Sequence, residues 1–305
     1  MANLDIIVPF YNDFSGIQEL LKSLIQFSKF TNIIIVDDNS SEEQYAGVLK
    51  LSEEYSYIKV IKNNSGLKGA GSCRNIGLLE SNAPWIMFAD SDDHFLKGAS
   101  EIIQHYTGQD YDMVYFPPIS TDEKGNLGHR HDTYLSYFKS DIDSLNYNNL
   151  RYKLPVVWSR LFNSTFIKSN KITFEETIVS NDRMFSLISG VKASSIKIEK
   201  NSVYSWNFNS SSLTTKMSKE RFWINLKVFE RANTYLKSNV NDFEFKNYSE
   251  SGCKYIAMSL IRYKYGIFFT FKILLYFINK RITIINIADL KRLKTFFINN
   301  KYYSE

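Results

Sequence analysis

Three carboxylates stand within four residues, at Asp90, Asp92 and Asp93, directly after the apolar run 85–89. Like charges this close repel one another, and the capping of a helix needs only one such side chain. A solvated acidic turn is the alternative interpretation. A divalent cation would relieve the repulsion, and carboxylate oxygens are suitable ligands for Mg²⁺ and Mn²⁺. We therefore expect a Mn²⁺ or Mg²⁺ site in which one or two carboxylates bind directly and substrate phosphates complete the shell.

A second pair of acids, Asp37 and Asp38, lies at the end of the apolar run 33–37. Asn39 or Ser40 can cap a following helix, which leaves the acids solvated beside it. At the mouth of a buried strand, the same two acids could instead accept hydrogen bonds from the N–H groups of a nucleotide base.

The loop 63–77 contains several glycines together with Lys68 and Arg74. Such a loop can place cationic groups against anionic oxygens. A long turn before a helix, in which Gly77 permits close packing, is the alternative. Farther along, Asn181 and Asp182 open an apolar helical pattern, and the helix macrodipole by itself favours an acid there.

Other polar and aromatic side chains could face an acceptor. His129 and His131 would share one face of an extended segment and could bind a metal. A polar loop is favoured instead, because histidine metal sites usually have further ligands nearby. Trp158 suits either the core or a sugar-stacking platform. Further acceptor-loop candidates are Tyr204, Trp206 and the serines at 210–212.

Alternating elements must position these residues. Short apolar runs separated by amphipathic stretches predict a parallel sheet covered by helices on both faces. The predicted strands are 4–9, 33–37, 58–61, 85–89 and 113–116, and the helices between them are 15–29, 41–54, 70–81 and 96–106. Ligands of such sheets bind beyond the carboxyl ends of the strands. The segment from Pro9 to Asn12 lacks the glycine-rich turn of a dinucleotide-binding unit, and no P-loop motif is present.

The second half of the chain changes character near residue 215. Residues 119–153 are predicted to be an irregular excursion over the sheet, and 155–174 a strand, a turn and a short helix. A helix over 181–190 and an extended segment over 194–208 follow. Helices are then predicted over 218–238, 245–280 and 286–300. We expect two domains, residues 1–215 and 216–305.

Composition limits the class of protein. The chain has 305 residues, 44% hydrophobic, with a formal net charge of +5, which excludes intrinsic disorder. Cys73 and Cys253 cannot form a disulfide framework, so a reducing compartment is expected. No basic segment precedes the first apolar run, so we expect no signal peptide and a cytoplasmic location.

The charge is unevenly distributed. Residues 253–305 contain ten Lys and Arg and two acids, a net +8, which leaves −3 for residues 1–252. On one helix over 254–280, an apolar stripe would lie opposite the lysines: Ile256, Leu260, Ile267, Phe271, Leu274 and Ile278. This stripe could pack inward, with the cations exposed to water or to the anionic inner face of the plasma membrane. The uncharged runs are too short to span a bilayer, and no nucleic-acid recognition motif is present.

Six segments, in this order, resemble a family 2 glycosyltransferase of the GT-A fold, a Rossmann-like, mostly parallel α/β sheet flanked by helices. The resemblance covers about residues 4–208. The segments are Val8-Pro-Phe-Tyr-Asn12, Val36-Asp-Asp-Asn-Ser40, the glycine-containing stretch ending in Arg74-Asn-Ile-Gly77, Phe88-Ala-Asp-Ser-Asp-Asp93, Val157-Trp-Ser-Arg-Leu161 and Asn181-Asp182.

The resemblance implies a role for individual residues. The implied donor site consists of Pro9, Tyr11, Asp38, Arg74, Asp90 and Ser91. Asp38 would accept from a uracil-type N3–H, and Arg74 would lie against the nucleotide. Asp92 would bind the metal directly, with Asp90 close to the metal and the donor sugar. Asp182 would be the catalytic base. The sequence departs from the family at Asn181, where Glu is usual, and no histidine follows His131 to serve as a late metal ligand.

The implied activity is inverting transfer from a UDP-type sugar to a hydroxyl of a saccharide or lipid-linked acceptor. Its product would be a bacterial surface polymer such as capsule, lipopolysaccharide or teichoic acid. A sugar-nucleotide nucleotidyltransferase is one alternative, but it would need a glycine-rich, arginine-containing loop after the first strand. A non-catalytic carbohydrate- or membrane-binding scaffold is another.

Overall fold

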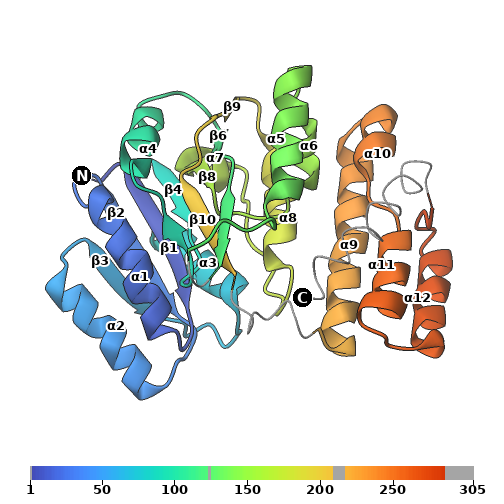
Figure 1. Ribbon diagram of the computed structural model, residues 1–305, viewed down its shortest axis with the longest axis horizontal. Helices are drawn as coiled ribbons and strands as arrows, with labels where there is room; N and C mark the ends of the chain where they lie inside the picture. The colour runs from blue at the N-terminus through green and yellow to red at the C-terminus, as the bar shows by residue number, and fades with distance from the viewer. Residues whose placement is uncertain (1, 123–124, 209–216, 286–305) are drawn as a thin grey trace. The chain divides into compact units, whose positions relative to one another are not determined.

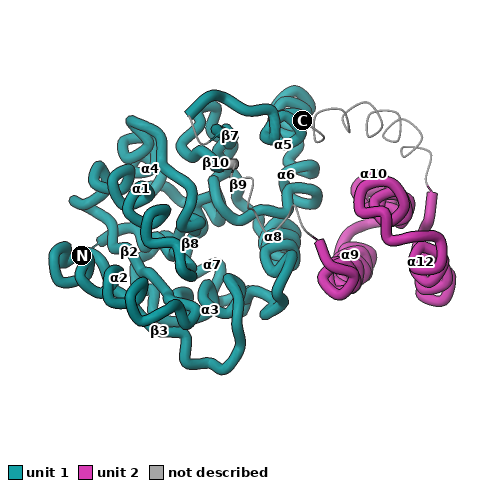
Figure 2. The backbone as a smooth tube through the Cα atoms, turned by 60° about the horizontal axis from the view of Figure 1, so that its bottom comes forward, with its two compact units in different colours: residues 1–215 teal, residues 216–305 magenta. Residues whose placement is uncertain are grey.

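The computed structural model describes residues 2–122, 125–208 and 217–285. The chain divides into two compact units, residues 1–215 and residues 216–305, which Figure 2 colours separately. Each unit has its own cluster of buried apolar side chains. The first unit contains the β-sheets, and the described part of the second is helical.

The main sheet of the first unit has seven strands in the order β3-β2-β1-β4-β8-β6-β9 (Figure 1). Their bounds are β1 Leu4–Phe10, β2 Thr31–Asp37, β3 Ile58–Lys62, β4 Trp85–Phe88, β6 Met113–Tyr115, β8 Arg160–Asn163 and β9 Ile196–Ile198. β8 pairs antiparallel with β4 and β6, and the other pairings are parallel. The predicted mostly parallel α/β fold is therefore confirmed.

Helices flank this sheet (Figure 1). Their bounds are α1 Phe14–Leu24, continued by a 3₁₀ turn Ile25–Phe27, then α2 Glu42–Glu54, α3 Ala70–Glu80, α4 Ala99–Thr107, α5 Asp132–Ser144, α6 Asn148–Lys153, α7 Ser164–Ser169 and α8 Asn181–Lys192. Helices on both faces explain why β1 and β2 are almost continuously apolar and buried. α3 packs so closely on β1 that a Cβ atom at Gly77 would come within 2.3 Å of Ile7 Cγ2.

A second sheet of three strands lies in the order β5-β10-β7. Its strands are β5 His94–Phe95, β7 Ile119–Asp122 and β10 Tyr204–Phe208. β10 pairs antiparallel with β5 and parallel with β7. Because β5 follows the acidic turn directly, its pairing with β10 holds the turn against that strand.

The prediction of an irregular excursion over 119–153 is wrong, since β7, α5 and α6 lie there. α5 buries few side chains, which include Phe138, so its apolar pattern is weak in the sequence. Asp141 is buried on α5 and accepts hydrogen bonds from the backbone N–H groups of Asn149 and Leu150, which stabilises the start of α6.

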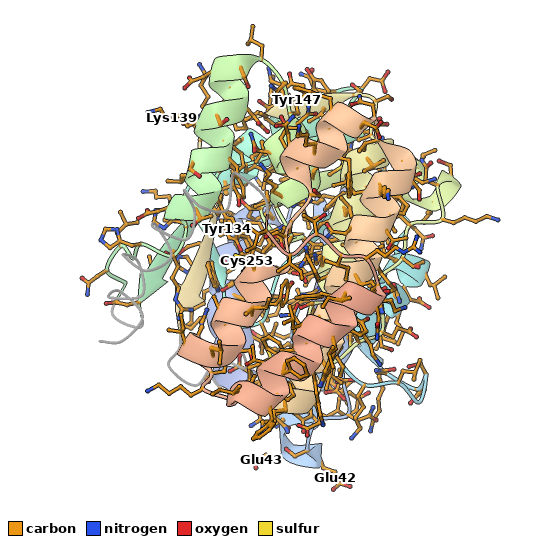
Figure 3. All side chains as sticks on the ribbon, turned by 90° about the vertical axis from the view of Figure 1, so that its right-hand side faces the viewer. Glu42, Glu43, Tyr134, Lys139, Tyr147 and Cys253 are labelled. Carbon is orange, nitrogen blue, oxygen red and sulfur yellow. The ribbon has the colours of Figure 1, made fainter. Side chains whose placement is uncertain are left out.

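The described part of the second unit consists of helices. They are α9 Lys219–Asn239, α10 Asp242–Tyr248, α11 Cys253–Ala257, a π-helical turn Met258–Arg262 and α12 Ile267–Asn279. Cys253, the first residue of α11, is labelled in Figure 3. Aromatic side chains dominate the core, where Phe229 packs against Tyr255 and Phe277 with ring centroids 4.5 and 6.0 Å apart.

The prediction of one helix over 245–280 is wrong. Gly266 has φ +91° and separates α12 from the π-helical turn, a conformation that favours glycine. The predicted inward stripe is wrong too, because Ile267, Phe271 and Ile278 are more than half exposed. Among the described helices, none has the length and apolarity needed to cross a bilayer. The helix predicted over 286–300 lies outside the described residues.

Candidate functional site

The loop after β3 is hydrogen-bonded to Asp38, the acid that follows β2. Asp38 Oδ1 accepts from Asn63 Nδ2 at 2.8 Å, and Asp38 Oδ2 accepts from the Gly69 backbone N–H at 2.7 Å. Gly69 has φ +109°, and α3 begins at the next residue. Asp38 is half-buried, whereas Asp37 is fully buried and accepts from the Ser40 backbone N–H. The two adjacent acids therefore have different environments, and Asp38 lies at the mouth of the sheet.

The segment after β1 lies beside the segment after β2. Asn12 donates its backbone N–H to Ser40 Oγ at 3.0 Å, and Ser41 donates its backbone N–H to Asn12 Oδ1 at 2.8 Å. Tyr11 is 60% exposed, and Pro9 is half-buried within β1. The exposed Tyr11 ring is therefore available to a ligand at the carboxyl edge of the sheet.

Arg74 connects two segments that are far apart in the sequence. It is buried on α3, with Nη2 2.5 Å from Asp90 Oδ1 and Nη1 donating to Asn181 Oδ1 at 2.8 Å. Its guanidinium group also lies 5.4 Å from the centroid of the Phe174 ring. These contacts bring the end of β4 and the start of α8 to one place. Asn181, where the resemblance leads one to expect Glu, thus supplies an oxygen acceptor to this arginine.

The acid nearest β5, Asp93, is partnered within the protein. It is almost fully buried and accepts from Tyr204 Oη at 2.7 Å and from the Asn207 backbone N–H at 2.8 Å. The Tyr204 hydroxyl also accepts from the Asp90 backbone N–H. Burial, followed by the charges of Asp90 and Asp92, raises the pKa of Asp93. Asp93 thus holds the acidic turn on β10.

Asp92 differs from its two neighbours in having no side-chain hydrogen-bond or ion-pair partner among the described residues. It is exposed at the surface, yet desolvation by the surrounding protein and the charge of Asp90 raise its pKa to about 6. Ser91, between the two acids, donates to Asp13 Oδ2 at 3.2 Å. Asp13 also caps α1 by accepting from the Gly16 backbone N–H.

These partners decide how the acidic turn fits a divalent cation. Arg74 compensates Asp90 on one oxygen, and Tyr204 and the Asn207 N–H compensate Asp93, so Asp92 is the carboxylate left for an ion. No group of three or more potential metal-binding His, Cys, Asp or Glu side chains is found in the described ranges. One or two carboxylates fit a Mg²⁺ or Mn²⁺ ion whose other ligands are phosphate and water.

Asp182 lies in the first turn of α8, which begins at Asn181 after Ser180 at φ +57°. Burial raises the pKa of Asp182, and Asp90 adds to the rise, whereas the positive charges of Arg74 and Arg160 lower it. A carboxylate in this environment has its proton affinity increased toward that of a useful general base. The dipole of α8 is the alternative account of an acid at this position.

Arg160, the first residue of β8, is a feature that the sequence prediction did not select. Its side chain is fully buried, and Nη2 donates to the Leu154 carbonyl at 2.6 Å. Its Nε and Nη1 atoms, and the hydroxyl of Tyr115 beside it, have no hydrogen-bond partner in the part of the chain that the structure describes. The guanidinium group lies 4.9 Å from the centroid of the Tyr115 ring. The motif Val157-Trp-Ser-Arg-Leu161 contained this residue, but only the fold places it at the carboxyl edge.

The predicted acceptor residues have mixed environments. His131 is buried in a turn, and its Nδ1 atom lies 2.8 Å from Ser120 Oγ. His129 is exposed, so the two histidines do not share the face of a strand. Trp158 is buried and stacks on Tyr204 with ring centroids 5.6 Å apart, which places both side chains in the core. Trp206 is partly exposed beside them. The serines at 210–212 lie outside the described residues.

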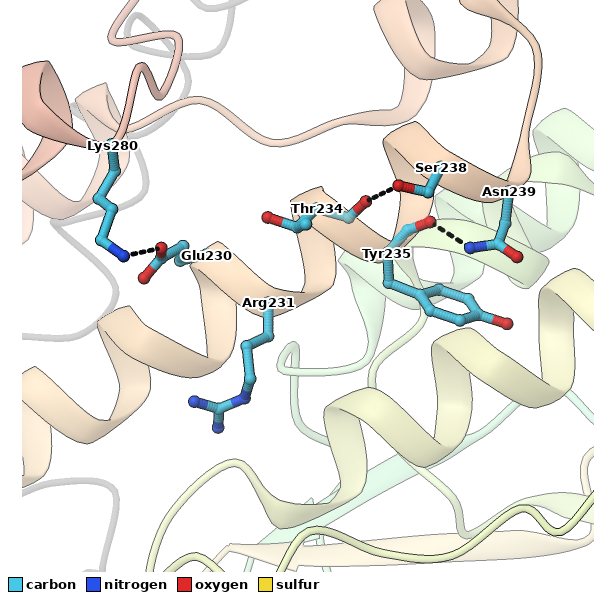
Figure 4. Close-up of a pocket in the computed structure, with 7 residues that line it drawn as sticks. All are labelled: Glu230, Arg231, Thr234, Tyr235, Ser238, Asn239 and Lys280. Atoms are coloured by element: carbon cyan, nitrogen blue, oxygen red, sulfur yellow. Dashed lines mark hydrogen bonds and ion pairs between the residues drawn. The ribbon is translucent and has the colours of Figure 1, made fainter.

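A hollow is found on the second unit (Figure 4). Its lining residues are Glu230, Arg231, Thr234, Tyr235, Ser238, Asn239 and Lys280. Lys280 forms an ion pair with Glu230 at 2.9 Å, and Asn239 Nδ2 donates to the Tyr235 carbonyl. Because its polar groups largely satisfy one another, this hollow is not the candidate site.

Comparison with known proteins identifies the family. Residues 5–165 match the family model described as glycosyl transferase family 2. The chain belongs to this family. The match includes Asp38, Arg74 and the acidic turn, and it ends before Asp182. The predicted family is therefore confirmed, which favours glycosyl transfer over the nucleotidyltransferase alternative.

Characterised family members align with much of the chain. TarS of Staphylococcus aureus (strain MW2), a poly(ribitol-phosphate) β-N-acetylglucosaminyltransferase, is 26% identical over 213 residues, covering 67% of this chain and 35% of TarS. The GalNAc(5)-diNAcBac-PP-undecaprenol β-1,3-glucosyltransferase of Campylobacter jejuni is 25% identical over 260 residues, 85% of this chain and 82% of that protein. The chain thus spans about a third of the length of TarS.

Solved structures share the fold. Residues 1–349 of S. aureus TarS in complex with UDP-GlcNAc superpose with a TM-score of 0.62 at 16% identity, covering 85% of this chain and 73% of that one. The mannosyltransferase PcManGT from Pyrobaculum calidifontis in complex with GDP-Man and Mn²⁺ gives a TM-score of 0.58 at 10% identity, covering 96% and 79%. The predicted GT-A fold is confirmed.

Proposed function

We propose that this glycosyltransferase moves a sugar from a UDP-type donor to a hydroxyl group of a saccharide or lipid-linked acceptor in the synthesis of a bacterial surface polymer. Residues 1–215 would be the catalytic domain and residues 216–305 a helical module. The names of two relatives support this acceptor class, since one is named for poly(ribitol phosphate) and the other for an undecaprenol-linked glycan. The crystal structures of TarS with UDP-GlcNAc and UDP support the donor class.

The observation that carries the proposal is the double contact of Arg74. Through Asp90 and Asn181, this buried side chain joins the turn that carries Asp92 to the start of α8, which carries Asp182. Asp92 would bind the metal with the aid of Asp90, and a Mn²⁺ or Mg²⁺ ion held there would supply a Lewis acid that neutralises charge on the leaving diphosphate.

The other residues would bind the donor and move one proton. Asp38, oriented by Asn63 and Gly69, would accept from the base N3–H, with Pro9 and Tyr11 lining the same pocket. Asp182 would take the proton of the acceptor hydroxyl as its oxygen bonds to the anomeric carbon. One base opposite the leaving group gives a single displacement, hence inversion of the anomeric carbon.

The test uses the full chain with a panel of nucleotide sugars and Mn²⁺. In a thermal-shift assay, a UDP-sugar at a hundredfold excess over its Kd should stabilise the protein by about 2.7 kcal/mol. Asp182→Asn should retain this stabilisation and lose transfer, whereas Asp92→Asn should lose the Mn²⁺-dependent part. Asp110→Asn, an exposed acid ahead of β6, is the control. Undiminished turnover of Asp182→Asn would reject the assignment of the base.

The same proposal places the enzyme in the cytoplasm, in peripheral contact with the inner face of the plasma membrane. A lipid-linked acceptor would be reached most directly from that surface. The net charge of +8 over residues 253–305 supports contact with anionic lipids.

A further inference from the structure

Helix α12 exposes a continuous apolar face. Its five large exposed side chains range from 43% exposed for Leu275 to 89% for Phe268, and the other members are Ile267, Phe271 and Ile278. At 100° per residue, these five positions fall within an arc of about 100° on the helix. The opposite side of α12 is occupied by Thr270, Ile273 and Phe277, which are buried in the core of the unit. The apolar face is therefore additional to the face that stabilises the fold.

This surface is larger than the scattered apolar exposure of an ordinary surface helix. In the view of Figure 3, α11 and α12 are nearest the viewer and their side chains are drawn as sticks. Leu260 and Ile261, in the π-helical turn that precedes α12, are exposed as well, at 42% and 39%. Contiguous exposed apolar side chains bordered by polar ones indicate a surface that binds a partner or a membrane.

Basic residues precede, flank and follow α12. Residues 251–285 contain six Lys and Arg and no Asp or Glu. Lys264 precedes α12, Lys272 lies beside the apolar arc, and Lys280 and Arg281 follow the helix. Lys280 is paired with Glu230, but Lys264, Lys272 and Arg281 form no ion pair with a described residue. An anionic surface would complement this arrangement.

We infer that the exposed face of α12 docks on an anionic lipid bilayer, with the helix lying in the plane of the interface. Its 13 residues would extend about 20 Å along the surface. The apolar side chains would enter the headgroup and acyl boundary, while the lysine side chains reach the lipid phosphates. The orientation is opposite to the one expected from the sequence, in which the apolar stripe packs inward and only cations meet the lipid.

A second copy of the chain fits this face less well than lipid does. Two copies facing each other through α12 would bring two basic segments together, without an acid from residues 251–285 of either copy. Such like-charge contacts oppose association. Anionic headgroups compensate the same charges, at a free-energy gain that decreases with salt.

The experiment is flotation of the full chain with vesicles of equal parts phosphatidylglycerol and phosphatidylcholine, compared with phosphatidylcholine alone. The double variant Phe268→Ser and Phe271→Ser should lower the partition coefficient at least about tenfold. The double variant Lys264→Gln and Lys272→Gln should lower it roughly thirtyfold on anionic vesicles and little on neutral ones. Phe243→Ser is the matched control, because Phe243 is 74% exposed on α10.

Three outcomes would overturn the inference. They are an absence of vesicle binding by the natural chain, an equal loss of binding in Phe243→Ser, and a lipid-free dimer that Phe268→Ser dissociates in light scattering. Thermal unfolding of each variant shows whether it is folded. The inference deepens the proposed peripheral location, but flotation needs neither donor nor acceptor. Failure to bind vesicles is therefore distinguishable from failure to transfer sugar.

Discussion

Arg74 Nη2 lies 2.5 Å from Asp90 Oδ1, so a side chain on α3 forms an ion pair with the acid that follows β4. The remaining Nη1 of the same guanidinium group donates to Asn181 at the start of α8. A planar group with fixed donors can make both contacts at once, which a lysine cannot. The position of Asp90 relative to the start of α8 therefore depends on one arginine.

Replacement of Arg74 by Lys should keep the charge and lose one of the two contacts. We expect kcat to fall on the order of 10²-fold, because small displacements of catalytic groups have effects of that size. Steady-state kinetics at saturating donor measures the change. Asn181→Glu should remain within a few-fold of the natural enzyme, since Glu also offers Arg74 an oxygen; an equal loss in both variants would contradict the role given to Arg74.

Asp92 and Asp93 should separate binding from folding. Asp93→Asn replaces one of the two carboxyl oxygens that accept from Tyr204 and the Asn207 N–H, and should cost about 1–3 kcal/mol of unfolding free energy. Asp92 has no such partners, and its raised pKa means that the folded protein disfavours its charge, so Asp92→Asn should leave the free energy of unfolding unchanged or increase it. It should instead lower Mn²⁺-dependent donor affinity by roughly tenfold or more, about 1.4 kcal/mol. Urea unfolding and calorimetry measure the two effects, and the reverse pattern would exchange the two roles.

The pH dependence of transfer should report Asp182. Burial raises the pKa of this carboxyl, so its ionised form is lost as pH falls through a value above that of an ordinary aspartate. The acid limb of kcat/KM should therefore lie at higher pH than for an exposed Asp. Arg160→Met removes a positive charge that lowers this pKa, and the limb should move to still higher pH. Arg160→Lys should restore it; an unmoved limb in Arg160→Met would exclude the coupling.

Gly77 should not tolerate a side chain. A Cβ atom there would lie 2.3 Å from Ile7 Cγ2, between α3 and β1. Gly77→Ala should cost about 1–3 kcal/mol of unfolding free energy through overpacking. Measured in a protein that already carries Ile7→Ala, which removes the obstructing atoms, the same substitution should cost less. Gly108→Ala is the control, because a Cβ atom at that position would meet no described atom within 4 Å. Thermal and urea unfolding measure both variants, and equal effects at the two glycines would show that flexibility, and not packing, is lost.

The parallel part of the fold could be predicted because its strands are buried on both faces. Leu4–Phe10 and Thr31–Asp37 are apolar runs for that reason, and the residues following them lie at one edge by topology. The antiparallel β8 could not be distinguished, since a run of four residues has no direction in its sequence. α5 was missed because it buries little apolar surface.

The residue types of the candidate site could be predicted from the sequence, but the hydrogen-bond partners of its acidic side chains could not. The acids at Asp90, Asp92 and Asp93 are visible as a cluster, but Tyr204 is 111 positions from Asp93. Only the fold shows that Asp93 is compensated and Asp92 is left open. The stripe on α12 failed for a different reason, because apolar residues occupy most of this helix and its period does not identify the buried side.

The direction of β8 also affects the segment that precedes it. β6 ends and β8 begins at the same edge, since the two strands pair antiparallel with Tyr115 opposite Arg160. The intervening chain, with β7, α5 and α6, therefore leaves and re-enters the sheet on the ligand side. A change in its α5 and α6 would leave the strand order of the seven-stranded sheet as it is. A chimera that exchanges this segment would therefore change one edge of the sheet and leave the pairing of β1, β2, β3 and β4 intact.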